Sequence, residues 1–226
     1  MFAIYKKELK SYFVTPIGYV FVGLFLLILS VVFYIGLYSE KYSNFEYVFG
    51  DGAFLIMFII PILTMRLFSE ERKSGTEQLL LTSPRSITSI VLGKFFAAVT
   101  VVAISIVFTL MYFFILNYFG SPSITIAIST MIGFLLLTLA YISLGMFISA
   151  ITENQIISAF ATMAIFLILY LAPQTIEALA PIWLIYLFST FTEGVIAVDS
   201  IILLLAFTII FVLLTIIVIQ KRKNVK

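Results

Sequence analysis

The sequence predicts an all-α integral membrane protein: a bundle of six transmembrane helices with an N-terminal interfacial helix and a short re-entrant segment before the last span. Of the 226 residues, 63% are hydrophobic and 11% are charged, and the mean hydropathy is +1.22. Soluble domains are roughly half apolar and a quarter charged. The composition therefore excludes soluble enzymes, nucleic-acid-binding proteins and disordered chains. Residues 1–226 are expected to form a single transmembrane domain.

Six apolar stretches are predicted to cross the roughly 30 Å of bilayer hydrocarbon. Backbone amides in lipid must bond within their own segment, so these stretches must be helical. The alternating pattern of a membrane β-barrel is absent, because the stretches are apolar on all faces. They cover residues 17–38, 52–65 (with an extension to about 69 through Arg66), 95–119, 124–152, 154–173 and 200–220.

The basic residues set the predicted orientation. With six spans, both termini and the loops 66–94 and 152–154 share one side, and that side holds every Lys and Arg except Lys41. The positive-inside rule then places both termini in the cytoplasm. The stretch 178–191, interrupted by Pro181, is too short to span, so the extracytoplasmic region 174–199 is predicted to be re-entrant.

Region 1–16 is predicted to be an amphipathic helix on the inner membrane surface. Its apolar residues recur at helical spacing, its lysines occupy the other face, and Pro16 ends it. A basic helix of this kind places its aromatic residues among the lipid headgroups. It serves either as a surface anchor or as a contact for a cytoplasmic partner. The residues concerned are Phe2, Tyr5, Leu9, Tyr12 and Phe13 on one face and Lys6, Lys7 and Lys10 on the other.

The loop 66–94 contains eight charged residues and an organised pattern. A turn at Gly75 is expected to follow the charged run Glu70–Ser74. A short helix then starts at Thr76-Glu77-Gln78, buries Leu79, Leu80 and Leu81, and ends at Ser83-Pro84, before the third span begins near Ile87. The pattern predicts a helical element at the membrane surface. The alternative is a set of charges that simply solvate the ends of two spans.

The span interiors contain no ionisable side chain, which argues against an ion- or proton-driven carrier. Neutral polar residues are instead expected to bond between helices, with Gly133 and Gly145 allowing close approach. These polar residues are Ser105, Thr109, Asn117, Thr138, Ser143, Ser149, Ser158 and Thr162.

Several enzyme classes are excluded by missing residues. The chain has no Cys and no His, so thiolate and Ser–His mechanisms are impossible. A P-loop needs GxxxxGK[ST], but Gly93-Lys94 has Thr88 in place of the first glycine and is followed by Phe95. We therefore expect no catalytic residue, no metal site and no cofactor bound by this chain, and no ATP hydrolysis by the chain itself.

Residues 55–94, LIMFIIPILTMRLFSEERKSGTEQLLLTSPRSITSIVLGK, resemble the signature stretch of ABC-2-type transporter permeases. That signature joins P-x-L-T-M-R to E-E-[RK]-x-x-G-T-x-[EQ]-x-L-L and then S-P. The closing segment FTEGVIAVDSIILLLAFTIIFVLLT is similar to the small six-span bacterial permeases of the gliding-motility type. The resemblance covers essentially the whole chain.

The resemblance implies a permease subunit of an exporter in the bacterial plasma membrane. Two permeases, identical or paralogous, would assemble with two copies of a cytoplasmic ATPase that uses ATP and Mg²⁺. The segment 66–94 would carry the coupling helix that contacts this ATPase, and nucleic acid would have no part. The implied coupling residues are Glu70, Glu71, Arg72, Lys73, Gly75, Thr76 and Glu77. The substrate is not indicated.

A non-transport role is the alternative: a membrane scaffold, or an immunity protein that sequesters a membrane-active peptide. Such a protein needs no ATPase. Charge reversal at Glu71 or Arg72 distinguishes the two roles, because a scaffold should tolerate it and a permease should lose coupling.

Overall fold

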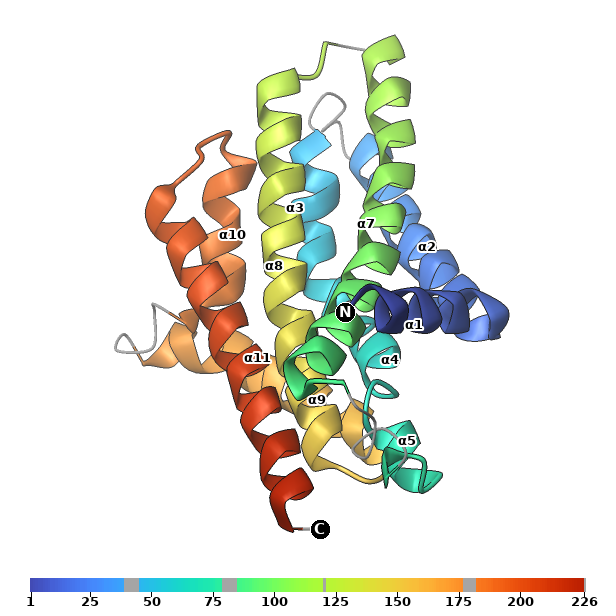
Figure 1. Ribbon diagram of the computed structural model, residues 1–226. Coiled ribbons are helices and arrows are strands. Elements are labelled where there is room, and N and C mark those ends of the chain that lie inside the picture. Colours follow the sequence, from blue (N-terminus) through green and yellow to red (C-terminus); the bar gives the residue numbers. More distant parts are fainter. Residues whose placement is uncertain (39–44, 79–84, 120, 177–181, 226) are drawn as a thin grey trace.

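The computed structural model describes residues 1–38, 45–78, 85–119, 121–176 and 182–225 (Figure 1). Within these residues the regular structure is entirely helical, in agreement with the predicted all-α class. The helices are α1 Phe2–Val14, α2 Pro16–Tyr38, α3 Phe45–Ile56, α4 Ile60–Thr64, α5 Ser69–Lys73, α7 Ile87–Phe119, α8 Ile124–Ile151, α9 Gln155–Thr175, α10 Leu184–Thr192 and α11 Val198–Val225.

Five of the described helices are long and apolar enough to cross a membrane: α2, α7, α8, α9 and α11. Four of them closely match predicted spans. Helix α7 begins at Ile87, near where the third span was expected to begin and before the apolar stretch 95–119, so Lys94 lies inside a helix. The predicted break before α2 is confirmed, because Thr15 adopts extended backbone immediately before Pro16.

The prediction of one continuous helix over 52–65 is wrong. The structure has α3, then a turn at residues 57–59, then α4. Pro61 lies at the start of α4. A proline has no N–H to donate, and its ring clashes with the carbonyl four residues earlier, so Pro61 favours a break in the helix that arrives from Phe45. The turn is closed by short-range bonds such as Ile59 N–H to Ile56 O, 2.9 Å.

Helix α8 is the centre of the molecule and packs against α3, α4, α7, α9, α10 and α11 (Figure 1). Phe134 on α8 lies in contact with Phe25 of α2, Phe49 of α3 and Phe188 of α10, with ring centroids 4.8–6.1 Å apart. All four rings are fully buried. Edge-to-face aromatic pairs at this spacing stabilise a core beyond the area they bury.

Gly133 on α8 allows the close approach of α10 that was expected of it. A Cβ at this position would overlap Phe191, with the ring Cδ2 only 2.7 Å away. We expect Gly133→Ala to cost about 1–3 kcal/mol of stability, because overpacking displaces the ring. Gly23→Ala on α2 is the matched control, since nothing lies within 4 Å of its added Cβ. Thermal unfolding in detergent should show a lower Tm for Gly133→Ala alone.

Most buried hydroxyl groups bond within their own helix, so the prediction that they join helices is wrong for these residues. Each donates to a carbonyl three or four residues earlier, which satisfies the hydroxyl without a partner helix. This holds for Ser105, Thr109, Thr138, Ser143 and Thr162. Ser149 is different, as described below.

The region 174–199 contains the end of α9, the nine-residue helix α10 and the turn into α11. In Figure 1, α10 lies alongside α8, and α11 then runs past α8 toward the C-terminus. Gly194, with φ of +81°, makes the turn after α10. Residues 177–181, which include Pro181, lie outside the described residues.

Candidate functional site

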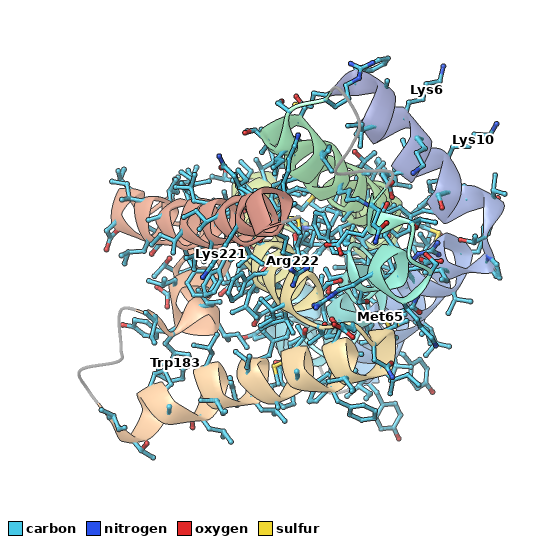
Figure 2. The ribbon with its side chains drawn as sticks, turned by 60° about the horizontal axis from the view of Figure 1, so that its bottom comes forward. Lys6, Lys10, Met65, Trp183, Lys221 and Arg222 are labelled. Carbon is cyan, nitrogen blue, oxygen red and sulfur yellow. The ribbon has the colours of Figure 1, made fainter. Side chains whose placement is uncertain are left out.

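Charged side chains gather where five separate parts of the chain meet: α1, α5, the first turns of α7, the turn after α8, and the end of α11. Figure 2 views this end of the molecule, with Met65 and Arg222 near the middle and Lys6 and Lys10 pointing away from it. Residues 66–78 lie at the junction, and we call them the charged segment. The predicted elements at Leu79–Leu81 and Ser83-Pro84 lie outside the described residues.

The predicted turn in the charged segment is confirmed. Helix α5 carries Glu70 and Glu71 in its first turn and Arg72 and Lys73 in its last, which is the charge order that a helix dipole favours. Gly75 follows with φ of +72°, a conformation that only glycine adopts freely. The Ser74 hydroxyl bonds to Glu70 O and to Thr76 Oγ1, at 2.9 and 2.8 Å. Glu77 and Gln78 then resume helical backbone.

Ser149 of α8 anchors the beginning of the charged segment. Its buried Oγ accepts the N–H groups of Phe68 and Ser69, at 3.0 and 3.1 Å, and donates to Met65 O at 2.9 Å. One turn earlier, Gly145 leaves room for Thr64, because a Cβ at Gly145 would approach Thr64 Cβ to 2.9 Å. The two small residues therefore seat the α4–α5 connection directly on α8.

We expect Ser149→Ala to destabilise the protein by on the order of 2 kcal/mol, because it leaves the buried N–H groups of Phe68 and Ser69 without the Ser149 acceptor, whereas Met65 O keeps the Ser69 hydroxyl. Ser105→Ala is a matched control. Ser105 is equally buried, but its hydroxyl donates only to Val101 O in the same helix. Thermal unfolding in detergent measures both variants, and an equal loss of Tm would contradict the anchoring role of Ser149.

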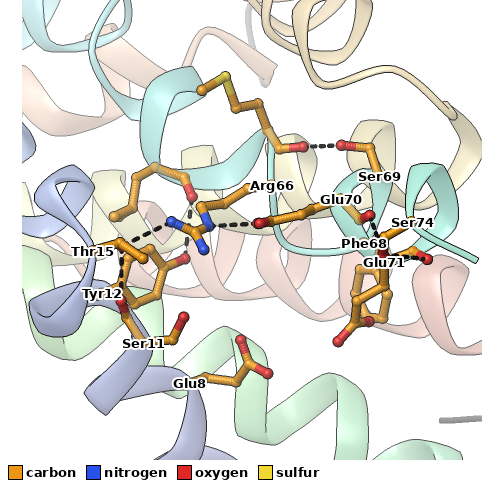
Figure 3. A network of polar contacts seen from close by, with 12 residues as sticks. Glu8, Ser11, Tyr12, Thr15, Arg66, Phe68, Ser69, Glu70, Glu71 and Ser74 are labelled. Atoms are coloured by element: carbon orange, nitrogen blue, oxygen red, sulfur yellow. Dashed lines mark hydrogen bonds and ion pairs between the residues drawn. The ribbon is translucent and has the colours of Figure 1, made fainter. Parts of the chain in front are cut away.

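Arg66 joins the charged segment to the C-terminal end of α1 (Figure 3). Its guanidinium lies 2.8 Å from Glu70 Oε2, donates to Thr15 Oγ1 at 3.0 Å, and lies 5.9 Å from the ring centre of Tyr12. The Tyr12 hydroxyl donates to Leu63 O at 3.1 Å. Burial raises the pKa of the Tyr12 phenol, so it stays a neutral donor.

Lys94 of α7 reaches the charged segment from the other side. Its Nζ lies 2.9 Å from Glu71 Oε1 and 3.3 Å from Glu8 Oε1 of α1. The Lys94 side chain is only 2% exposed, and the two carboxylates are 16% and 14% exposed. A lysine is almost never fully buried unless it is paired, and this one has two anionic partners.

Two further ion pairs extend from the charged segment to the remaining helices. Arg72 lies 2.5 Å from Glu153 in the α8–α9 turn and donates to Ile151 O at 3.1 Å. Glu77 lies 3.1 Å from Arg222 near the end of α11. A groove of about 550 Å³ lies between this part of the segment and α11. The charged segment is thus bonded to α1, α7, α8, the α8–α9 turn and α11.

The predicted apolar face of α1 is turned toward the protein rather than toward lipid headgroups alone. Tyr12 is buried, and the Tyr5 hydroxyl lies 3.0 Å from Thr100 Oγ1 of α7. Leu9 packs against the core. Phe13 is half-buried against the core, and the remaining predicted residues of this helix, Phe2, Lys6, Lys7 and Lys10, are exposed.

The candidate coupling residues lie together in the charged segment. The side chains of Lys73 and Thr76 are exposed to solvent, whereas those of Glu71 and Glu77 are largely buried in ion pairs. Sequence reasoning did not assign the charged partners that hold them: Glu8, Arg66, Lys94, Glu153 and Arg222. Ser149 was among the residues expected to bond between helices, and it does so. Lys94 carried a usable signal, because it is a lone charge directly before a long apolar run. Glu8, Glu153 and Arg222 are distant in sequence and gave no such signal, whereas Arg66 lies four residues before Glu70, with which it pairs.

The described residues contain no group of three or more acidic, His or Cys side chains placed to hold a metal ion. The arrangement is one of ion pairs and hydrogen bonds that connect helices. It is suited to transmitting a displacement of the charged segment to the long helices around it.

Comparison with known proteins agrees with the signature at residues 55–94. A family model described as "ABC-2 family transporter protein" matches residues 7–221. The match includes most of α1, the whole charged segment, and α11 as far as Lys221. A search of curated proteins finds no match.

Proposed function

The chain belongs to the ABC-2 family of transporter proteins, and on this basis we propose that it is the membrane-spanning permease subunit of an ABC exporter in the bacterial plasma membrane. Two permeases, identical or paralogous, form the substrate pathway. A separate cytoplasmic ATPase, present in two copies, binds ATP and Mg²⁺ and drives transport. The charged segment is the site at which this ATPase acts on the permease.

A six-span topology is consistent with the helices. At about 1.5 Å per residue, Phe45–Thr64 is long enough to cross the hydrocarbon core, so α3 and α4 together form the second span. Helix α10 is too short to span and forms the re-entrant element before α11. The charged end of the molecule then lies on one side, which the positive-inside rule assigns to the cytoplasm, with both termini.

The observation that carries the proposal is the bonding of the charged segment to five other parts of the bundle. Arg72 pairs with Glu153, and Glu77 pairs with Arg222. A displacement of the turn at Gly75 is therefore transmitted to the α8–α9 turn and to α11. A passive loop needs no such connections. When ATP closes the ATPase dimer, the equilibrium between the inward-open and outward-open states of the helices shifts, because the closed dimer binds one of these two states more tightly.

Site-directed cross-linking tests the proposed docking site. The chain has no Cys, so a cysteine introduced at Thr76 is the one position on this chain that carries a photo-reactive maleimide. Tyr38→Cys is the control, because Tyr38 is exposed at the other end of α2. We expect a soluble P-loop ATPase to be captured in native membranes from position 76 and not from position 38. Capture of no ATPase from position 76 favours the scaffold or immunity role.

A further inference from the structure

We propose that Lys94 is the positioning residue that fixes α5 relative to the α1–α7 pair, so that a movement of the charged segment is transmitted to the N-terminal helix. The inference deepens the proposed function and rests on it for the transport consequence. The three groups come from three elements: Glu8 from α1, Glu71 from α5 and Lys94 from α7.

Helices α1 and α7 are already one unit. They pack closely where α1 crosses the N-terminal part of α7, and Gly93 of α7 lies so near α1 that a Cβ there would sit 3.2 Å from Tyr5 N. The Tyr5–Thr100 hydrogen bond adds to this contact. Whatever holds α5 to either helix therefore holds it to both.

Among the described residues, little direct packing joins α5 to this pair. A cavity of about 570 Å³ separates α1 from α5, and it is lined by charged side chains that include Glu8, Arg66, Glu71 and Lys94. Ion pairs across the cavity are therefore the mechanical connection. Arg66 connects α5 to the C-terminal end of α1 through Thr15, and Lys94 connects it to the middle of α1 through Glu8.

Of the three side chains Glu8, Glu71 and Lys94, the lysine is the one that holds the other two together. One buried ammonium is shared by two nearly buried carboxylates, Glu8 and Glu71, and offsets half of their charge. Without it, two like charges face each other across the cavity, and among the described residues neither forms an ion pair with another buried cation. Glu8 then keeps its pair with Lys7, which is 67% exposed. Repulsion between the carboxylates, and their need for water, would then drive α5 away from α1.

Spin labels on the cysteine-free chain test the connection directly. Labels at Ala3→Cys on α1 and Lys73→Cys on α5 report the distance between the two helices in the purified full chain, in lipid nanodiscs without an ATPase. We expect a narrow distance distribution in the native background, a broader and longer one with Lys94→Met, and recovery of the narrow one with Lys94→Arg. Methionine keeps an unbranched side chain and removes the charge.

Glu8→Gln is the second variant, since it removes the α1 share of the bridge and leaves Lys94 paired with Glu71. It should also broaden the distribution. Lys223→Met, an exposed lysine near the C-terminus, should leave it unchanged. A distribution that stays narrow in both Lys94→Met and Glu8→Gln overturns the inference.

A transport assay tests the functional consequence separately from the distance measurement. With the ATPase present, we expect Lys94→Met to lower the substrate moved per ATP hydrolysed by about tenfold, within the usual range of coupling effects, and Lys94→Arg to restore most of it. The distance measurement needs no ATPase, so it decides the role of Lys94 even where the proposed function fails. Normal coupling in Lys94→Met, with a broadened distance, would refute the transport consequence alone.

Discussion

Gly75→Pro is expected to yield an inserted, folded protein in which ATP hydrolysis no longer drives transport. Proline fixes φ near −65°, whereas the turn requires +72° at this residue. Proline also lacks the N–H that Gly75 donates to Arg72 O at 3.2 Å. The turn must therefore rebuild, and Thr76 and Glu77 are displaced from α5. We expect transport per ATP hydrolysed to fall at least about tenfold in reconstituted vesicles, as a lost coupling free energy of about 1.4 kcal/mol would give.

Gly75→Asn is the matched control for the backbone requirement. Nothing lies within 4 Å of an added Cβ at this position, so the substitution adds no clash. Asparagine tolerates positive φ better than other side chains. It should retain most of the coupling. Equal activity of the proline variant and the native chain would show that the turn does not transmit movement.

Glu77→Arg is the second substitution expected to have a large effect. Glu77 is 10% exposed and faces Arg222, and Lys221 and Arg72 line the same groove. A third arginine there would be held among like charges, at a cost on the order of 2 kcal/mol or more. We expect the end of α11 to separate from the charged segment, with loss of ATP-driven transport. The double variant Glu77→Arg with Arg222→Glu restores the pair and should recover transport.

Glu193→Arg provides the comparison for a charge reversal outside the site. Glu193 is exposed at the C-terminal end of α10, remote from the charged segment. It should transport normally. Failure of the double variant to recover, while the protein remains folded and inserted, would argue against the Glu77–Arg222 pair as a connection.

The sequence predicts local features of this fold well because their causes are local. Gly75 indicates its own turn, and Pro16 indicates the end of α1, since each residue restricts the backbone at its own position. Hydropathy alone finds α2, α8, α9 and α11. It misses the division between α3 and α4, because an average over apolar residues does not register that Pro61 lacks a hydrogen-bond donor.

The partners of the site could not be predicted in the same way. The pattern of α1 shows which face is apolar, but not whether lipid or α7 covers it, so the burial of Tyr12 was not foreseen. Lys94 and Glu8 are far apart in the chain, and their meeting depends on how α1 crosses α7. The sequence shows which residues of the charged segment are charged. Which side chains pair with them depends on the tertiary structure.

The most direct test of the account is purification of the native complex from its own membrane in mild detergent, followed by mass spectrometry of the proteins that co-elute. The account predicts a stoichiometric soluble P-loop ATPase, together with a second copy of this chain or a paralogue. It also predicts that the Gly75→Pro chain inserts normally but no longer couples ATP hydrolysis in that complex to transport. A pure chain without an ATPase, under conditions that keep other ABC transporters intact, would contradict it.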